Sequence, residues 1–269
     1  MKEPQLQVKC VGSDLRSICR GSCVTWPLIM ARVLIVTPTF NERENLEALV
    51  TSVFEVLPEA DILVVDDASP DGTGELADEM AARETCVEVM HRTGKLGLGT
   101  AYLAGFAWGL ERGYEYIIEM DADLSHDPRY LPSFLEALEG GADLVIGSRN
   151  IPGGDVEGWG PFRHILSKGG SLYSRTILGL KVRDLTSGYK AFRRNVLESI
   201  NLDEVHSEGY SFQIELTYRA VLQGFSVAEV PIVFVDRRAG QSKMSGNIFL
   251  EAVLTVLRLR WNALTGTLT

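Results

Sequence analysis

The sequence has few cysteines and no long apolar run. It contains only four cysteines in 269 residues, and three of them, Cys10, Cys19 and Cys23, fall among the first thirty residues. This distribution disfavours both a disulfide framework and a structural zinc site. No segment approaches the roughly 18 consecutive apolar residues of a transmembrane helix, and the N-terminus lacks the apolar core of a signal peptide. We therefore expect a cytoplasmic protein with reduced thiols.

Motifs of several common nucleotide-binding and hydrolytic enzymes are also missing. GxGxxG does not follow the first predicted strand and GxxxxGKS occurs nowhere, which disfavours a dinucleotide-binding Rossmann domain and a P-loop. Ser148 stands in the context Ile-Gly-Ser-Arg rather than in the GxSxG motif of hydrolases. The net charge of −10, from 36 acidic and 26 basic residues, argues against nucleic acid as a partner.

Short β-branched runs alternate with amphipathic helical stretches from Arg32 onward. The predicted strands are 33–36, 62–65, 87–90, 116–120, 144–146 and 227–235, and later helices are predicted near 165–178 and 212–222. Asn41 is expected to cap the first helix, whose apolar residues recur every three or four positions. The alternation predicts an α/β fold, with a mainly parallel sheet flanked by helices in a single domain.

The two ends of the chain differ from this pattern. Residues 1–30 have no regular period and are predicted to be a disordered extension, residues 31–246 are the predicted folded domain, and the Gly-rich segment 152–161 is expected to be a mobile loop. Residues 247–269 predict an amphipathic helix and tail. Its polar stripe is Asn247, Glu251, Thr255, Arg258 and Asn262. The pattern fits equally a helix docked on the core and one lying in a membrane interface.

Acidic residues follow three of the predicted strands, in segments 37–42, 66–72 and 121–126. Ligands of parallel α/β sheets collect at the carboxyl ends of the strands. Three acidic clusters at one edge repel each other, and a divalent cation bridging a diphosphate would neutralise them. Asp121 and Asp123 alternate, so one could hold the ion and the other the sugar of a nucleotide. As turn formers and helix caps, the same residues also have a purely structural explanation.

Basic residues complete this pattern. Arg149 follows the fifth strand, Arg163 and Lys168 lie on the next predicted helix, and Arg237, Arg238 and Lys243 follow the last strand. Arginine binds phosphate through two parallel hydrogen bonds. Cations after the strands of an otherwise acidic protein indicate that anionic ligands enter beside the carboxylates. Ordinary salt bridging is the alternative explanation.

Segments 38–42, 65–73 and 121–126 together resemble the inverting glycosyltransferase family 2, whose fold is called GT-A, and the resemblance spans roughly residues 31–247. Segments 184–190, 209–213 and 230–243 are similar to polyprenol (dolichol) phosphate mannose synthases. The resemblance thus implies a GT-A domain over 31–246. It implies inverting transfer of mannose from GDP-mannose to a polyprenyl (dolichyl) monophosphate.

The same resemblance implies roles for individual residues. The implied donor ligands are Pro38, Phe40, Glu42, Val65, Asp67, Asp121, Ala122, Asp123, Arg237 and Lys243. Asp123 would be the catalytic ligand of Mg²⁺ or Mn²⁺, and Ser125 a second metal ligand where some relatives supply Gln. Arg149, also catalytic, would receive the lipid phosphate with Arg163 and Ser167. Phe40 replaces a frequent Tyr and so lacks one hydroxyl contact.

A lipid phosphate needs no dedicated general base, because it is largely ionised at neutral pH with a second pKa of about 6. We expect peripheral attachment to the cytoplasmic face of a membrane, with a separate membrane-anchoring protein as a possible partner. Two alternatives stay open: a glucosyl or aminosugar transferase that uses a UDP-sugar, and a non-catalytic module that only binds a nucleotide sugar.

Overall fold

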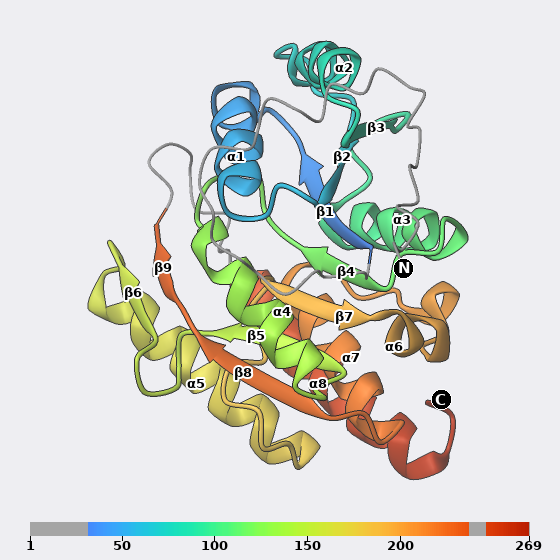
Figure 1. Ribbon diagram of the computed structural model, residues 1–269. Coiled ribbons are helices and arrows are strands. Elements are labelled where there is room, and N and C mark those ends of the chain that lie inside the picture. Colours follow the sequence, from blue (N-terminus) through green and yellow to red (C-terminus); the bar gives the residue numbers. More distant parts are fainter. Residues whose placement is uncertain (1–31, 237–245, 269) are drawn as a thin grey trace, which may run out of the picture. The chain divides into compact units, whose positions relative to one another are not determined.

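The computed structural model describes residues 32–236 and 246–268 (Figure 1). The predicted extension 1–30 and the expected donor ligands Arg237 and Lys243 lie outside the described residues. The domain boundaries predicted from the sequence therefore stay predictions.

A seven-stranded sheet forms the centre of the fold. Its strands are β1 (Val33–Thr39), β2 (Asp61–Asp66), β3 (Val87–His91), β4 (Tyr116–Glu119), β5 (Leu144–Ser148), β7 (Lys190–Arg193) and β8 (Val227–Pro231). The order is β3-β2-β1-β4-β7-β5-β8, and β7 pairs antiparallel with both of its neighbours. All other pairings are parallel, which confirms the predicted mainly parallel sheet.

The chain reverses its direction of winding between β1 and β4, which lie side by side with Val36 opposite Glu119. On one side of β1 the sheet continues with β2 and then β3. On the other side of β1 lies β4, with which the second half of the sheet begins. In α/β sheets, ligands bind outside the carboxyl ends of the strands at such a switch point. The acidic segments after β1, β2 and β4 therefore all begin at this edge.

Helices pack in two groups. One comprises α1 (Arg43–Val56), α2 (Thr73–Arg83) and α4 (Leu131–Glu139), and the other α3 (Leu98–Glu111), α5 (Pro161–Leu178), α6 (Arg194–Ser199), α7 (Gly209–Leu222) and α8 (Gly246–Thr265). Helix α3 contacts α6 and α7, α7 contacts α8, and α8 contacts α5, while α1 contacts α2 and the short turn Pro128–Tyr130 that precedes α4 (Figure 1). Two helical layers thus enclose the sheet.

The start of α1 differs from its prediction. Leu46, Leu49, Val50 and Val53 are buried, as the apolar spacing predicts. Asn41, however, is not the cap: Glu42 occupies that position without a side-chain capping bond, and Asn41 has a left-handed backbone with φ of 62°. The backbone N–H of Glu42 donates instead to Thr73 Oγ1 at 3.0 Å. The prediction that Asn41 caps α1 was therefore wrong. The loop between β1 and α1 is instead hydrogen-bonded to the segment that follows β2.

The predicted strand 227–235 and the predicted loop 152–161 were only partly right. The strand breaks after Pro231, where buried Ile232 separates β8 from β9 (Val233–Val235). Strand β9 leaves the main sheet and pairs in parallel with β6 (Asp155–Glu157), which lies inside the predicted loop. The loop is therefore hydrogen-bonded to the chain that follows β8. Strands β6 and β9 form a second, two-stranded sheet.

Helix α8 is docked on one side and exposed on the other. Thr255, Val256 and Leu259 are buried, although Thr255 belongs to the predicted polar stripe. A second apolar row remains exposed, formed by Leu254, Leu257, Trp261 and Leu264. In the described part of the chain, no helix combines the length and apolarity needed to cross a bilayer.

Helix α3 approaches β1 so closely that two of its residues must be glycine. A Cβ on Gly105 would overlap Val36, and one on Gly109 would lie 2.7 Å from Leu34. We predict that Gly105→Ala lowers the free energy of unfolding by about 1–3 kcal/mol, as overpacked core substitutions do. Urea denaturation measures this loss. Gly169→Ala is the matched control, because nothing lies within 4 Å of that helical position, and it should gain about 0.5–1 kcal/mol. Equal effects at the two positions would contradict the close approach.

Candidate active site

Three residues at the carboxyl edge of the sheet adopt the left-handed backbone conformation that favours glycine. Asn41, Ala68 and Leu124 have φ values of 62°, 55° and 62°, and they follow β1, β2 and β4 respectively. For Ala and Leu this conformation costs on the order of 1–2 kcal/mol each. Such strain persists where the surrounding contacts determine the loop, and it clusters at functional sites. These three loops are therefore held in shape by their neighbours.

The carboxylates of Asp66, at the end of β2, and of Asp71 are satisfied by hydrogen bonds within the protein. Asp66 is buried and accepts hydrogen bonds from Thr39 Oγ1 at 2.9 Å and Ser69 Oγ at 2.6 Å. Asp71 accepts from the backbone N–H and hydroxyl of Thr73 at 3.0 and 2.6 Å. The structural explanation that the sequence left open accounts for both residues. Their clustering therefore needs no cation.

Asp67, an expected donor ligand, fixes the loop between β3 and α3. Its carboxylate accepts from Arg92 Nη1 at 2.6 Å and from the backbone N–H groups of Leu96 and Gly97 at 3.1 and 3.2 Å. Asp67 and Arg92 are both largely buried. Next in this loop, Lys95 places its Nζ 3.8 Å from the ring centre of Phe40. Asp67 thus brings a cation onto the aromatic face expected to meet the nucleotide.

The other expected donor residues are unequally accessible. Pro38, Phe40 and Glu42 are half-buried at the end of β1 and the start of α1. Val65 is fully buried within the hydrophobic core, so its side chain packs against protein and only its backbone could meet a ligand. Glu42 also accepts from Asn45 Nδ2 at 2.8 Å.

Asp121 and Asp123 stand in a tightly bonded turn after β4. Asp121 Oδ1 accepts from Tyr102 Oη at 2.8 Å, and the Asp121 N–H donates to His126 Nδ1 at 3.0 Å. Asp123 Oδ1 accepts from both the N–H and the hydroxyl of Ser125, at 3.1 and 2.5 Å. Burial, and then the charge of Asp121, raises the pKa of the Tyr102 hydroxyl, which therefore stays protonated. Ser125 thus positions Asp123 in this structure.

The donor set here suits a metal that is shared with a substrate. Among the described residues, no three His, Cys, Asp or Glu side chains converge in a metal-binding arrangement. Mg²⁺ is commonly held by one or two carboxylates together with substrate phosphates and water. Half-buried Asp121 and Asp123, with Ala122 buried between them, fit that chemistry with a diphosphate as the other ligand.

A buried cross-strand pair lies directly beneath this turn. Glu119 of β4 and Lys190 of β7 are opposite each other in the antiparallel ladder, and both are fully buried. Lys190 Nζ donates to the carbonyl oxygen and Oε1 of Gln213, each at 2.7 Å. Burial raises the pKa of Glu119 and lowers that of Lys190, while each charge opposes the effect of burial on the other. Sequence patterns missed this pair because β7 was not predicted.

Arg149 and Asp184 form a buried ion pair at the end of β5. Arg149 donates from Nε to Asp184 Oδ2 at 2.7 Å and from Nη2 to Oδ1 at 2.8 Å, and its backbone N–H donates to Oδ2 at 3.0 Å. Thr186 Oγ1 accepts from Nη2 at 3.0 Å. Burial would raise the pKa of Asp184, but the Arg149 charge holds that pKa below its ordinary value. These hydrogen bonds therefore fix the orientation of the Arg149 guanidinium.

An aromatic cluster connects Arg149 with the acidic turn. Phe234 of β9 lies 5.4 Å from the Arg149 guanidinium carbon and 5.9 Å from the ring of His126. His126 is buried and stacks on Tyr189, with 4.8 Å between the centres of the two rings. Trp159 contacts Phe234 at 5.7 Å. Sequence patterns could not reveal this cluster, because the stacking partners of His126 are distant from it in the sequence.

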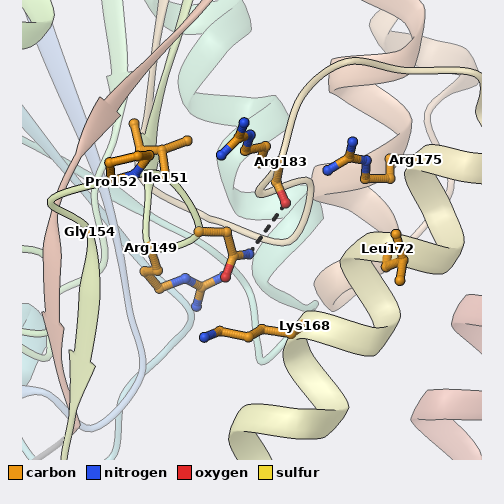
Figure 2. A pocket seen from close by; sticks show the side chains of 9 residues that line it. Arg149, Ile151, Pro152, Gly154, Lys168, Leu172, Arg175 and Arg183 are labelled. Carbon is orange, nitrogen blue, oxygen red and sulfur yellow. Dashed lines mark hydrogen bonds between the residues drawn. The ribbon is translucent and has the colours of Figure 1, made fainter.

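Two of the expected acceptor residues lie against one ring: the Arg149 guanidinium carbon is 5.6 Å from the ring centre of Trp159, which Arg163 also contacts. Arg163 is paired with Asp236 at 2.8 Å and stacks on Trp159 at 4.2 Å. Ser167 is half-buried on α5. A cavity of about 520 Å³ lies beside Arg149, and its other cationic lining residues are Lys168, Arg175 and Arg183 (Figure 2). The sequence singled out only Lys168 of these three, although Lys168, Leu172 and Arg175 have the spacing of one helix face.

Comparisons with known proteins agree on a family. The family described as "Glycosyl transferase family 2" matches residues 34–200. Polyprenol monophosphomannose synthase of Mycolicibacterium smegmatis is 57% identical over 84% of this chain and 85% of its own length. Undecaprenyl-phosphate mannosyltransferase of Micrococcus luteus is 52% identical over 88% of this chain and 99% of its own length.

Solved structures confirm the fold. The crystal structure of glucosyl-3-phosphoglycerate synthase from Mycobacterium tuberculosis in complex with phosphoglyceric acid matches with a TM-score of 0.64. The match covers 86% of this chain and 81% of the synthase chain, at 20% sequence identity. A second structure of the same enzyme, in complex with Mn²⁺, UDP-glucose and phosphoglyceric acid, also has a TM-score of 0.64 at 19% identity, covering 86% and 80%. The predicted GT-A fold is thereby confirmed.

The Arg149–Asp184 pair predicts a pH-dependent loss of stability. Asp184→Asn leaves Arg149 buried without its counter-charge, and should lower the free energy of unfolding at pH 7 by on the order of 3–5 kcal/mol. Because the folded-state pKa of Asp184 is lowered, the ionic part of this difference is present above the unfolded pKa of about 3.9 and disappears as the pH falls through the folded pKa. Urea denaturation of both proteins from pH 7 to pH 3 measures it.

Asp203→Asn is the matched control, because Asp203 is exposed and its loss should change stability by no more than about 0.5 kcal/mol. A difference between wild type and Asp184→Asn that stays constant down to pH 3 would show that the ion pair is not its source.

Proposed function

The chain belongs to glycosyl transferase family 2, and from this premise we propose that it transfers mannose from GDP-mannose to the phosphate of a polyprenyl lipid. The observation that carries the proposal is the placement of two charged halves at one edge of the sheet. Carboxylates Asp121 and Asp123 follow β4, and the cationic cavity beside Arg149 follows β5. A nucleotide diphosphate bridged by a cation suits the first half, and a lipid phosphate suits the second.

The donor is assigned to the acidic half. Pro38, Phe40 and Glu42 would line the nucleotide with the backbone of Val65, while Asp67 holds the loop that carries Lys95 over Phe40. Asp121, Ala122 and Asp123 would face the ribose and diphosphate, with Asp123 holding Mg²⁺ or Mn²⁺ and Ser125 orienting it. When bound, the metal would neutralise charge on the leaving diphosphate. Arg237 and Lys243, outside the described residues, are proposed to contact the same diphosphate.

The acceptor is assigned to the cationic half. An oxygen of the ionised lipid phosphate attacks the anomeric carbon, a new carbon–oxygen bond forms, and the bond to the diphosphate breaks with its electron pair leaving on GDP. In-line displacement inverts the configuration of that carbon. The fixed Arg149 guanidinium would orient the attacking phosphate, with Arg163 and Ser167 nearby on α5. Two anions can then approach each other because each has its own counter-charges.

Purified protein tests the proposal with GDP-mannose or UDP-glucose as donor and a polyprenyl phosphate in detergent as acceptor. We expect formation of polyprenyl phosphate mannose, detected by mass spectrometry, and little transfer from UDP-glucose. Faster transfer from UDP-glucose would instead support a glucosyltransferase. Tight binding of GDP-mannose without turnover on any polyprenyl phosphate would support a non-catalytic binding module.

Two controls within this assay test the metal assignment. Asp123→Ala should lower kcat by at least about 10²-fold, the scale seen when one electrostatic contact to a transition state is removed, whereas Asp203→Ala should leave it unchanged. EDTA should stop transfer and added Mg²⁺ or Mn²⁺ should restore it. Full turnover of metal-free protein in EDTA would refute the metal role.

We also propose that the exposed row of α8 attaches the protein to a membrane surface at its periphery. Leu254, Leu257, Trp261 and Leu264 are between 47% and 68% exposed, and they recur at three- and four-residue steps on a helix whose other side is docked. An interfacial helix has this arrangement. A cytoplasmic location and a separate anchoring protein stay predictions.

Liposome flotation tests this attachment. Leu257→Ser combined with Trp261→Ser should lower binding to vesicles by on the order of tenfold or more, because each buried apolar side chain contributes roughly 1.5–3 kcal/mol. Leu222→Ser is the matched control, since Leu222 is an exposed leucine of α7. Equal binding of the double variant and wild type would refute this role of α8.

A further inference from the structure

His126 faces the acidic turn with both of its ring nitrogens. Its Nδ1 accepts a hydrogen bond from the backbone N–H of Asp121 at 3.0 Å, and its Nε2 lies 4.0 Å from Asp121 Oδ2. The residue is only 3% exposed. A buried imidazole has little water to replace these contacts, so a shift of the ring would cost the hydrogen bond to the turn. The positions of His126 and Asp121 are therefore linked.

One face of the His126 ring packs on the protein core. Tyr189 stacks on this face with 4.8 Å between the ring centres and 12° between the ring planes. Tyr189 is fully buried, and its hydroxyl donates to the carbonyl oxygen of Asp127 at 3.2 Å. It also contacts Phe134, with 4.5 Å between ring centres. The core thus fixes this face of the imidazole, and the orientation of the ring depends on its remaining contacts.

Phe234 of β9 joins His126 to the cationic half of the site. Its ring centre lies 5.9 Å from that of His126 and 5.7 Å from that of Trp159, and both contacts are edge-to-face. The Arg149 guanidinium carbon lies 5.4 Å from the same phenyl ring. Trp159 also contacts the guanidinium groups of Arg149 and Arg163, at 5.6 and 4.2 Å. One side chain therefore touches residues from both halves of the site.

The segment that carries Phe234 has little support from regular structure. Strands β6 and β9 are three residues long each and form a two-stranded sheet, in which Phe234 lies opposite Val156. The side chains of residues 233–235 are all half-buried. A two-stranded pair is only marginally stable by itself. The conformation of this segment therefore depends on the contacts that its side chains make.

Two buried donors beside this small sheet are unsatisfied. Trp159 Nε1 and Arg163 Nε have no hydrogen-bond partner within the part of the chain that the structure describes. Arg163 Nη1, by contrast, donates to Asp236 at 2.8 Å. An unsatisfied buried donor costs free energy, and the cost is larger for a charged group. An anion that supplies acceptors here would therefore stabilise one arrangement of the segment.

The two proposed substrates would thus order the same residues. A diphosphate bound at the acidic turn would fix that turn and, with it, His126. A phosphate bound at Arg149 and Arg163 would fix their contacts with Trp159. Phe234 packs against the residues on both sides. When one ligand has already ordered a shared segment, a second ligand loses less conformational entropy there, and the two bind cooperatively.

We propose that His126 and Phe234 are positioning residues whose contact couples the two substrate positions. A nucleotide diphosphate at the acidic turn strengthens the binding of an isoprenoid phosphate at Arg149 and Arg163, and the reverse. This inference rests on the proposed function, which supplies the two ligand classes. Each ligand must change the affinity for the other by the same factor, because coupling free energies are reciprocal. The two anions also repel each other, but this repulsion is the same in a variant that changes no charge.

Titration calorimetry with GDP, Mn²⁺ and farnesyl phosphate measures the coupling without turnover, because GDP carries no sugar to transfer. The coupling factor is the Kd of farnesyl phosphate without GDP divided by its Kd at saturating GDP, both with Mn²⁺ present. Phe234→Leu should lower this factor at least about fivefold, the lower end of the range for coupled sites. Any effect of the variant on farnesyl phosphate alone cancels, because the factor is a ratio within one protein.

Two further variants separate the ring contact from a general loss of packing. Phe234→Tyr keeps the ring and should keep the wild-type factor. Phe54→Leu makes the same change at a half-buried phenylalanine near the end of α1, and should also keep it. If Phe234→Leu retains the wild-type factor, or if Phe54→Leu lowers it equally, the coupling does not pass through Phe234.

A double-mutant cycle tests the contact itself. His126→Asn removes the ring but retains an oxygen that can accept from the Asp121 N–H in place of Nδ1. This variant should lower the coupling factor. Its combination with Phe234→Leu should lower the factor no further than either change alone, because both remove the same contact. Independent losses that multiply in the double variant would overturn the contact between His126 and Phe234 as the route.

The transfer assay distinguishes failure of this inference from failure of the proposed function. Mannose transfer by wild type, with equal coupling factors in wild type and Phe234→Leu, would overturn the coupling and leave the function standing. A coupling factor that Phe234→Leu lowers, in a protein that transfers no mannose, would leave the coupling standing and overturn the function. Wild-type protein that binds no farnesyl phosphate, with or without GDP, would overturn both.

Discussion

The reversed direction of β7 determines what the edge of this sheet contains. Six strands run in parallel and bring the residues that follow them to one edge, but β7 runs antiparallel between β4 and β5 and brings the residues that precede it. Asp184 and Thr186 therefore reach the edge from before a strand and meet Arg149, which comes after one. The same reversal places Lys190 opposite Glu119 inside the sheet. The segment before β7 thus supplies the counter-charge of Arg149, and β7 itself supplies the lysine opposite Glu119.

Separation of charge follows from this arrangement. Carboxylates gather where β1, β2 and β4 end, and cations gather where β5 ends and along the facing side of α5. Between them lie the rings of His126, Phe234 and Trp159 rather than water-exposed polar groups. These aromatic rings occupy space between Arg149 and the acidic turn. The two substrates proposed above are both negatively charged, and each would have its own counter-charges in this arrangement.

Sequence patterns predicted most of the parallel sheet because each long strand is an apolar run bounded by turn residues, and the segment after Glu119 was recognisable as acidic. They could not predict β7, a four-residue strand that begins with a buried lysine, or the pairing of β6 with β9, which are distant in the sequence. The hydrogen bonds of Asp66 and Asp67 could not be read from their own segment alone, because Thr39 belongs to β1 and Arg92 follows β3. Arg175 and Arg183 could not be recognised as neighbours from the sequence, because one lies on α5 and the other on the chain after it, and the fold brings both to one cavity.

The left-handed residues Asn41, Ala68 and Leu124 have a consequence for the entropy of ligand binding. Glycine would adopt the same backbone angles without strain, but it would also let each loop sample many other shapes. A larger residue sacrifices some folding stability, and the hydrogen bonds around it then select a single loop shape. A ligand that enters at this edge meets loops that are already ordered, so little of its binding energy is lost to ordering them. These loops lose their conformational entropy once, when the protein folds, and do not lose it again each time a ligand binds.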